Sequence, residues 1–408
     1  MKRYLLFIVL IALAITSCGT SNDNKITITW WHFWTDTSIK PIIEEITADF
    51  EKKHPGVKVE LVDLTWADGH DKIAISFSSG AGPDVVELGS DWIPEFSSTG
   101  HLLDISDKTE SYRDGFLIWE PGLYENRHYA FPWILGTRVL FINQNLLMRA
   151  KYAPDYFPGY WNDLLTACER INSLGEEFYG FGSNSAERHR LYKKFLPFLW
   201  SNGGTILSND GKSCVLDNPE NVAALEYYLK LCKTGLTDTQ RRLEDAFLDG
   251  KIGFVISGDW LLKRIAREKP DFAFNTALIP TPDTNSVISS FAGGEYLCVN
   301  SKSAHPDLAF ELVKHICSPE NQLKFCQQNK TPTPSSVTAS TNDDFISQPH
   351  FMTFINQLKQ SKMPPAHPKW VYIEAELERA IEEALYEVKT PADALKDAIT
   401  KIDEILSQ

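Results

Sequence analysis

After its first 24 residues, the chain lacks any apolar run that is long and uncharged enough to cross a membrane. Arg138 interrupts the best of the later runs. A helix that spans a bilayer needs roughly 20 apolar residues, and the apolar stretch near the N-terminus is shorter than that. We therefore expect no membrane-spanning helix.

An excess of basic residues is also missing. The sequence has 40 Lys and Arg against 54 Asp and Glu, which gives a net charge of -14. If Lys2 and Arg3 are removed with an N-terminal signal, 38 basic residues face 54 acidic ones, so the net charge becomes -16. Such a surface repels phosphate backbones and anionic lipid, so no nucleic-acid partner is expected.

Paired cysteines and metal-binding patterns are absent too. The chain has seven cysteines but no Cys-x-x-Cys pair, and no paired histidines stand at zinc spacing. We therefore expect no metal and no other cofactor. Cys168, Cys232, Cys298 and Cys317 lie inside apolar patterns, which predicts small buried thiols, while disulfide pairing stays open.

Familiar enzyme motifs are missing as well. The sequence contains no Gly-x-Ser-x-Gly elbow, no His-Glu-x-x-His, no phosphate loop and no calcium loop. Two facing carboxyl groups could still hydrolyse a glycosidic bond, and Glu87, Asp91, Asp259 and Glu295 are candidates for such a pair. Each of them is also explained as a binding or solvated carboxylate, and we predict that the protein is not an enzyme.

The N-terminus has the parts of a secretory signal. Lys2 and Arg3 precede an apolar stretch at residues 5–15, and Cys18 follows the small residues Thr16 and Ser17. This arrangement resembles the lipobox of bacterial lipoproteins, in which the Cys is lipidated and becomes the first mature residue. The alternative is an ordinary signal peptide with an incidental Cys. The pattern predicts a signal at 1–17, a lipidated tether at 18–24 and a location outside the cytoplasm.

Strands and helices alternate in the first part of the mature chain. Residues 26–31, 57–62 and 84–88 read as strands, and residues 41–53 and 71–78 between them carry apolar side chains at helical spacing. Further strands and helices follow, up to two final helices at 372–388 and 391–406, the second capped by Thr390. This order predicts an α/β fold with largely parallel sheets covered on both faces.

Tryptophans gather at the expected strand ends. The chain has eleven of them, and several stand where a strand passes into a loop: Trp31, Trp34, Trp92, Trp133 and Trp260. Ligands of α/β sheets bind at the carboxyl ends of the strands. An indole packs on the C–H face of a sugar ring while charged side chains bind the hydroxyls, so a sugar site is predicted. Core packing is the alternative for each ring, and Trp30, Trp66, Trp119 and Trp161 are assigned to the core.

Several stretches stand in a characteristic order along nearly the whole mature chain. They are residues 26–34 with the helix ending at 50–57, the Gly-x-Pro-Asp stretch at 79–86, and residues 129–147, 246–260, 291–300 and 364–370. In this order they resemble the extracellular solute-binding proteins of the family that includes maltose-binding protein, the capture subunit of a sugar importer.

The resemblance implies two lobes, each a mainly parallel sheet flanked by helices, joined by three hinge crossings with a ligand between them. The first lobe is expected to comprise residues 25–134 and 290–334, and the second residues 135–289 and 335–408. Delivery of a sugar or oligosaccharide to an ABC permease is the implied function. We expect a monomer that reaches the membrane through the lipid on Cys18.

The ligand-binding residues follow from the strand ends and from the resemblance together. They are Trp31, Trp34, Asp36, Asp91, Trp92, Trp133, Arg138, Asp259, Trp260, Gly293, Gly294, Glu295 and Trp370. The two glycines allow close backbone approach to the ligand, or only a tight turn. Arg138 stands in a crossing where the family pattern has an acid, and Trp92 replaces a basic residue, so the sugar's identity stays open.

Two other functions compete with transport. One is a lipid-anchored carbohydrate-active enzyme that uses Asp91, Asp259 or Glu295, and the other is a surface lipoprotein that senses sugar or adheres to a partner protein. Within the transport class, a ligand such as glycerol phosphate is the alternative. The aromatic, acidic cleft that we expect argues against an anionic ligand.

Overall fold

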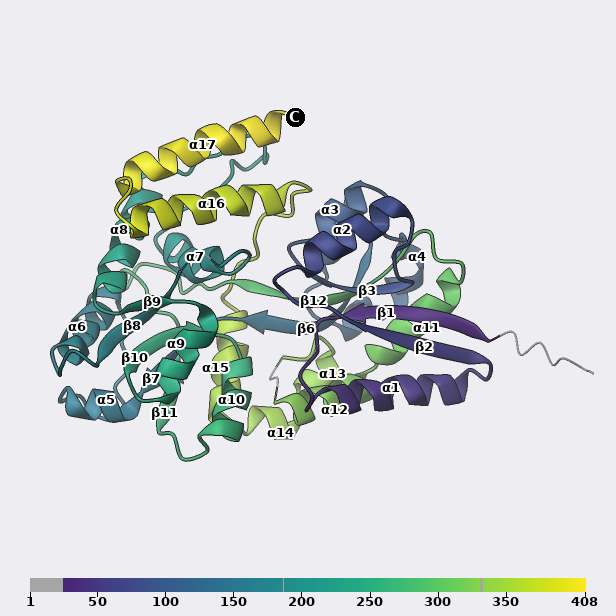
Figure 1. Cartoon of the computed structure of the whole chain (residues 1–408), viewed down its shortest axis with the longest axis horizontal. Coiled ribbons are helices and arrows are strands. Elements are labelled where there is room, and N and C mark those ends of the chain that lie inside the picture. Colours follow the sequence, from purple (N-terminus) through teal and green to yellow (C-terminus); the bar gives the residue numbers. More distant parts are fainter. Residues whose placement is uncertain (1–24, 186, 331–332) are drawn as a thin grey trace, which may run out of the picture.

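The computed structural model describes residues 25–185, 187–330 and 333–408, so the expected signal and the tether with Cys18 lie outside the described residues. Two five-stranded sheets lie side by side and define two lobes, with β6 and β12 reaching into the space between them (Figure 1). The two-lobed α/β architecture predicted from the sequence is confirmed.

The sheet of the first lobe has the strand order β2-β1-β3-β12-β6. Its first three strands are parallel, and β12 runs antiparallel to both β3 and β6. The strands are β1 (Ile26–His32), β2 (Val57–Asp63), β3 (Val85–Gly89), β6 (Ala130–Thr137) and β12 (Ala292–Val299). A small ribbon of β4 (Leu123–Tyr124) and β5 (Arg127–His128) lies outside this sheet.

Helices cover the first sheet because their apolar faces match it. In α1, Ile42, Ile43, Ile46 and Phe50 are buried, and the helix ends before His54-Pro55-Gly56, as the sequence predicts. The helices are α1 (Lys40–Lys53), α2 (Gly69–Ser79), α3 (Ile93–Ser98), α4 (Ser106–Thr109), α11 (Pro306–Ile316), α12 (Pro319–Asn329) and α13 (Val337–Ser340). Two short 3-10 helices cover Glu110–Gly115 and Glu120–Gly122.

The sheet of the second lobe has the order β11-β7-β10-β8-β9, in which only β7 is antiparallel to its neighbours. Its strands are β7 (Val139–Asn143), β8 (Tyr179–Asn184), β9 (Leu236–Asp238), β10 (Ile252–Ser257) and β11 (Phe274–Ala277). The remaining helices are α5 (Gln144–Arg149), α6 (Trp161–Asn172), α7 (Leu191–Ser201), α8 (Pro219–Lys233), α9 (Gln240–Leu248), α10 (Trp260–Glu268), α14 (Asp343–Ile346), α15 (Pro349–Leu358), α16 (Trp370–Leu385) and α17 (Pro391–Ser407).

The two final helices pack together and against α7 and α8 of the second lobe (Figure 1). The side chain of Thr390 accepts a hydrogen bond from the backbone N–H of Asp393 at 3.1 Å, so the predicted N-cap of α17 is confirmed. The first turn of α16 brings Trp370 into the core of the second lobe.

Hydrogen bonds tie the crossing segments to one another. Thr137 Oγ1 donates to the carbonyl of Phe291 at 2.8 Å, which joins the first crossing to the second. The backbone N–H of Leu135 donates to the carbonyl of Thr333 at 2.8 Å, which joins the first crossing to the third. Strand β6 stays in the first sheet as far as Thr137, so the lobe boundary expected after residue 134 falls inside this strand.

Six cysteines lie in the described part of the chain, and all six are buried and unpaired. The buried thiols predicted at Cys168, Cys232, Cys298 and Cys317 are therefore confirmed. Burial raises the pKa of the Cys214 and Cys232 thiols to about 12, which keeps both protonated at neutral pH. Among the helices of residues 25–185, 187–330 and 333–408, none combines the length and apolar character that crossing a membrane requires.

Candidate functional site

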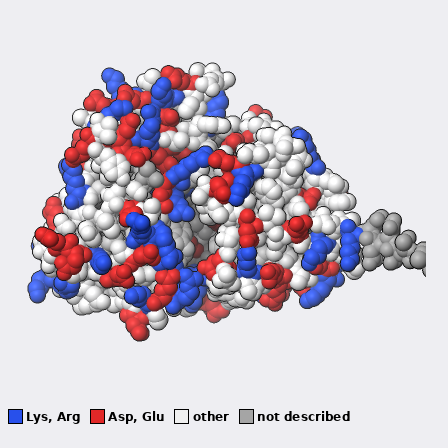
Figure 2. All heavy atoms as spheres, viewed as in Figure 1, with Lys and Arg blue, Asp and Glu red and all other residues white. Residues whose placement is uncertain are grey.

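A cleft of about 520 Å³ lies between the two lobes, and residues from both lobes line it. Figure 2 shows the hollow between the lobes, with Lys and Arg side chains beside it. The lining residues cluster just beyond the carboxyl ends of β1, β2, β3, β8 and β10 and at the start of the antiparallel β12. This is the edge at which α/β sheets bind ligands.

The first lobe contributes aromatic rings to the cleft. Phe33 and Trp34 follow β1, and Trp66 follows β2. The rings of Phe33 and Trp66 stack with centroids 4.2 Å apart and an interplanar angle of 19°. Trp66 keeps part of its surface exposed, so this pair presents an aromatic wall to the cleft.

The second lobe contributes Trp260, the first residue of α10, whose side chain is 37% exposed. Its indole N–H donates to Glu244 Oε1 at 2.6 Å, and the guanidinium carbon of Arg138 lies 4.6 Å from its ring centroid. The ring packs against Gly258, where a Cβ atom would come within 1.9 Å of it. These contacts fix the indole in the cleft.

Polar contacts join the two walls. Lys193 Nζ of α7 lies 2.9 Å from Asp91 Oδ2, and Tyr192 donates its hydroxyl hydrogen to the same oxygen at 2.6 Å. Nearer the rim, Arg188 pairs with Asp71 at 2.9 Å, while Arg267 pairs with Asp36 at 3.1 Å. Each contact links a residue of the second lobe to one of the first, so the lobes stand close together.

The cleft sets the protonation of its carboxylates individually. Burial works against ionisation of Asp91, but Lys193 and Tyr192 outweigh burial and lower the pKa of this carboxyl. The pKa of Asp36 falls to about 2, since hydrogen bonds from Ser38 outweigh its partial burial. Burial and the neighbouring Asp259 raise the pKa of Glu295 to about 7.

The charge of the lining differs from the prediction. Nine Lys and Arg side chains and five Asp and Glu side chains line the cleft, although acidic residues outnumber basic ones in the whole chain. The expectation of an acidic cleft is therefore wrong. The cleft is rich in basic residues because the start of α7 and one face of α10 bring Lys and Arg side chains to this edge of the sheet.

The structure brings most of the predicted site residues to one place. The predicted residues that line the cleft are Trp34, Asp36, Asp91, Arg138, Asp259, Trp260, Gly294 and Glu295. They come from both lobes and from the first two crossings. A Cβ atom at Gly294 would come within 2.2 Å of the Ile134 carbonyl oxygen, so the close pairing of β12 with β6 requires glycine there.

Five predicted residues lie elsewhere. Trp92, Trp133 and Trp370 are at most 1% exposed because they pack inside the lobes, so their assignment to the cleft is wrong. Trp31 packs on the core of the first lobe and does not line the cleft. Gly293 is buried, and a Cβ atom there would approach Ser90 Oγ within 2.7 Å, so packing within the lobe explains this glycine.

Several lining residues were missed. Trp66 was assigned to the core, yet it covers the buried Trp92 and itself faces the cleft. The sequence did indicate a cleft position for Trp66, because Trp66 follows the end of β2 just as Trp34 follows the end of β1. Lys193 and Lys194 belong to no sequence motif, and only the position of α7 in the fold brings them to the cleft.

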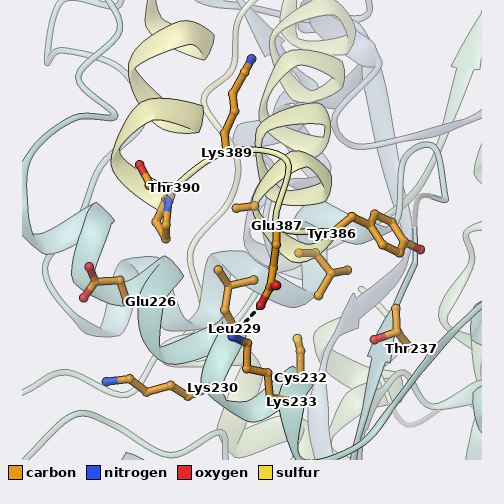
Figure 3. Close-up of a pocket in the computed structure, with 13 residues that line it drawn as sticks. Glu226, Leu229, Lys230, Cys232, Lys233, Thr237, Tyr386, Glu387, Lys389 and Thr390 are labelled. Atoms are coloured by element: carbon orange, nitrogen blue, oxygen red, sulfur yellow. Dashed lines mark ion pairs between the residues drawn. The ribbon is translucent and has the colours of Figure 1, made fainter.

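Other hollows fit a ligand less well. A cavity of about 500 Å³ lies between α8 and the turn that joins α16 to α17 (Figure 3). Glu387 Oε1 and Lys233 Nζ form an ion pair of 2.7 Å beside it. A second, of about 610 Å³, lies along residues 276–288 near Tyr160. Neither has tryptophan in its lining. Within the described ranges, no cluster of His, Cys, Asp or Glu is suited to hold a metal ion.

The sequence matches the family model of bacterial extracellular solute-binding proteins over residues 35–323. The chain belongs to this family. The family is extracellular, and this solute-binding protein accordingly acts outside the cytoplasm.

Individual relatives are similar over nearly the full length. A Brucella abortus protein named only as a binding protein is 24% identical, with 97% of this chain and 96% of that protein covered. The maltooligosaccharide ABC transporter solute-binding lipoprotein of Streptococcus pneumoniae R6 is 23% identical, with 96% of this chain and 90% of that protein covered. The structure of a solute-binding protein of Thermotoga lettingae bound with alpha-D-tagatose is similar to this one, with a TM-score of 0.86 and 23% sequence identity. The similarity covers 93% of this chain and 100% of that chain.

Proposed function

We propose that this solute-binding protein captures a sugar or oligosaccharide between its lobes and delivers it to the permease of an ABC importer. One observation carries the proposal: Trp34 and Trp66 from the first lobe share a cleft with Trp260 from the second. Indole faces pack on the apolar face of a sugar ring while charged groups bind its hydroxyls. The maltooligosaccharide named for the Streptococcus relative and the tagatose bound to the Thermotoga protein support the same ligand class.

Capture depends on contacts that the ligand makes with both lobes. A ligand shifts an open–closed equilibrium only by the difference between its affinities for the two states. Trp66 and Trp260 stand on different lobes, so a ring held between them would gain its second contact only on closure. We propose residues 25–134 with 290–334, and residues 135–289 with 335–408, as the two bodies that move.

The location that we propose is the outer side of a bacterial membrane. Cys18 would carry the lipid, residues 18–24 would form the tether, and the described part would work as a monomer. The word lipoprotein in the Streptococcus relative's name supports this anchor. Labelling of cells with a radioactive fatty acid, comparing wild type with Cys18→Ala, would test it, and equal labelling of both would contradict it.

Binding without turnover is the activity that we propose. Of the carboxylates considered for catalysis, Asp91 is already bonded to Lys193 and Tyr192, which leaves it poorly placed to act on a substrate. Incubation with oligosaccharides, followed by chromatography, should return every sugar intact. Release of shorter sugars would contradict this part of the proposal.

A thermal-shift screen across mono- and oligosaccharides tests the proposal. A ligand at 100 times its Kd stabilises the folded state by about 2.7 kcal/mol, which raises the melting temperature measurably. Hits are then titrated against wild type, Trp260→Ala and Tyr372→Ala, since Tyr372 is an exposed ring outside the cleft. Only Trp260→Ala should lose affinity. A panel without any hit, or equal losses in both variants, would contradict sugar capture in this cleft.

A further inference from the structure

The basic character of the cleft opposes the charge of the rest of the protein. The whole chain has 40 basic and 54 acidic residues, yet the lining has nine basic and five acidic ones. The basic residues are Arg138, Arg188, Arg190, Lys193, Lys194, Arg241, Lys263, Arg264 and Arg267. Ordinary surface composition does not explain this reversal, and only some of these cations already have a carboxylate partner.

Six of the nine form ion pairs. They are Arg188 with Asp71, Arg190 with Glu187, Lys193 with Asp91, Arg241 with Asp245, Arg264 with Glu244 and Arg267 with Asp36. Within the described ranges, Arg138, Lys194 and Lys263 form no ion pair, and Lys263 donates instead to the side chain of Asn329 at 2.9 Å. Three cations of the lining therefore have no ion pair within the described part of the chain, and two of them, Arg138 and Lys194, lie beside the Trp260 ring.

Lys194 is a deeply placed cation. It is 4% exposed, and its Nζ donates to the carbonyl oxygen of Ile256 at 2.8 Å. A lysine ammonium has three donors, so this bond leaves two of them unused. Burial and the neighbouring Arg138 together hold the pKa of Lys194 well below its usual range. A buried charge is costly unless an opposite charge pairs with it.

Arg138 and Lys194 converge on the same ring. The Arg138 guanidinium carbon lies 4.6 Å from the Trp260 ring centroid, and Lys194 Nζ lies 5.7 Å from it. A sugar stacked on this indole would therefore lie beside both cations. Both side chains line the cleft, so an anionic group on that sugar could reach them.

The acidic residues of the cleft limit how much negative charge it accepts. Burial lowers the pKa of Arg138, and the nearby carboxylates of Asp259 and Glu295 oppose that effect. They would repel a second anion, whereas they accept hydrogen bonds from hydroxyl groups. A ligand with many hydroxyls and a single anionic group fits this arrangement better than a polyanion does.

We propose that the ligand is an acidic saccharide, whose one carboxylate or phosphate binds Lys194 and Arg138 while a sugar ring stacks on Trp260. This inference rests on the proposed capture of a saccharide and specifies its class. It replaces the expectation, drawn from the sequence, that the cleft disfavours anions.

Matched pairs of ligands test the inference by calorimetry on the wild-type protein. The pairs are galacturonate with galactose, glucuronate with glucose, digalacturonate with galactobiose, and glucose 6-phosphate with glucose. A charge-assisted hydrogen bond is worth about 1.4 kcal/mol or more, so the acidic member of at least one pair should bind at least about tenfold more tightly. Higher salt should reduce that ratio.

Variants assign the effect to the named side chain. Lys194→Gln should bring the acid-to-neutral affinity ratio close to one, whereas Lys251→Gln, an exposed lysine at the opposite end of β10, should retain it. Melting curves without ligand check that both variants fold. Even if Lys194→Gln does not fold, the acid-to-neutral affinity ratios of the wild-type protein show whether it prefers acidic saccharides.

The outcomes separate the two proposals. If neutral sugars bind as tightly as their acidic partners or more tightly, the acidic class is wrong and sugar capture stands. If the ratio survives in Lys194→Gln, the anion binds elsewhere and the assignment fails. If no member of any pair binds, the proposed capture of saccharides fails as well. The carboxylate and phosphate pairs distinguish the two kinds of anion.

Discussion

Lys193 of the second lobe and Asp91 of the first form an ion pair of 2.9 Å across the cleft. Only 12% of the lysine side chain and 2% of the aspartate side chain are exposed, so water screens the pair weakly. Tyr192 bonds to the same carboxylate oxygen. This contact is more deeply buried than the Arg188–Asp71 and Arg267–Asp36 pairs, which also join the lobes.

Replacing Lys193 by Met should open the cleft. Removal of one partner from a buried ion pair costs about 3–5 kcal/mol, and here the loss falls on the closed arrangement because the partners belong to different lobes. We expect a larger radius of gyration in small-angle scattering and a ligand affinity lowered by about 100-fold or more. Lys251→Met, at an exposed turn of the same lobe, is the control. Superimposable scattering curves for Lys193→Met and wild type would refute this prediction.

The rim pair of Arg188 and Asp71 should matter far less. Both side chains are about half exposed, and pairs of this kind contribute about 0–1 kcal/mol. A double-mutant cycle on ligand affinity with Arg188→Ala, Asp71→Ala and the double variant measures their coupling. Added salt should reduce it further. A coupling energy above about 2 kcal/mol would show that the rim, and not the buried pair, holds the lobes together.

Tryptophans inside and outside the core should respond differently to truncation. Trp133 is 1% exposed, and truncating such a residue to Ala costs about 3–5 kcal/mol of folding stability. Trp260 is 37% exposed, so Trp260→Ala should lower ligand affinity and change the free energy of unfolding much less. Denaturant titrations with and without ligand measure both quantities. Equal losses of stability in the two variants would mean that Trp260 is a core residue.

Stability should depend on pH through Glu374. Burial, and to a lesser extent the nearby Asp91, raises the pKa of Glu374 to about 8 from its ordinary value of 4.5. A carboxyl group whose pKa is raised in the folded state contributes full stability below pH 4.5, and that contribution falls as the pH rises toward 8. Glu374→Gln keeps the neutral side chain at every pH, so its melting temperature should gain on wild type between pH 5 and 8.

Other groups around Glu374 titrate differently. Burial lowers the pKa of His189, its bonding partner, to about 4, so the contribution of His189 is lost as the pH falls from 6.5 toward 4. Burial and Glu374 raise the pKa of Glu378 to about 7. Lys193 and Asp91 also face the cluster, and Asp91 keeps a lowered pKa. A melting-temperature difference between Glu374→Gln and wild type that is constant from pH 5 to 8 would contradict the prediction.

The local sequence predicted the fold and eight of the residues that line the cleft. The alternation of β1 and the one-sided burial of α1 are properties of neighbouring residues, so periodicity reveals them. The residues that follow a strand end can be found in the same way, and Trp34, Asp91 and Trp260, which were selected on that basis, line the cleft.

Which of several nearby aromatic rings faces the cleft depends on packing between distant segments. Trp92 also stands near a strand end, but Trp66 and Phe33 pack against it and exclude it from the surface. Lys194 lies on a helix whose place is set by the rest of the second lobe. No pattern within a few residues of these side chains contains that information, so the acidic cleft inferred from the sequence was wrong.

The six thiols in the described part of the chain are buried and unpaired, so its folding needs no oxidant. Each sulfur is shielded by its own lobe, so a maleimide can reach it only when that lobe loosens. Labelling rates, resolved peptide by peptide, would therefore time the unfolding of each lobe separately, with Cys298 reporting on β12 and Cys168 on α6.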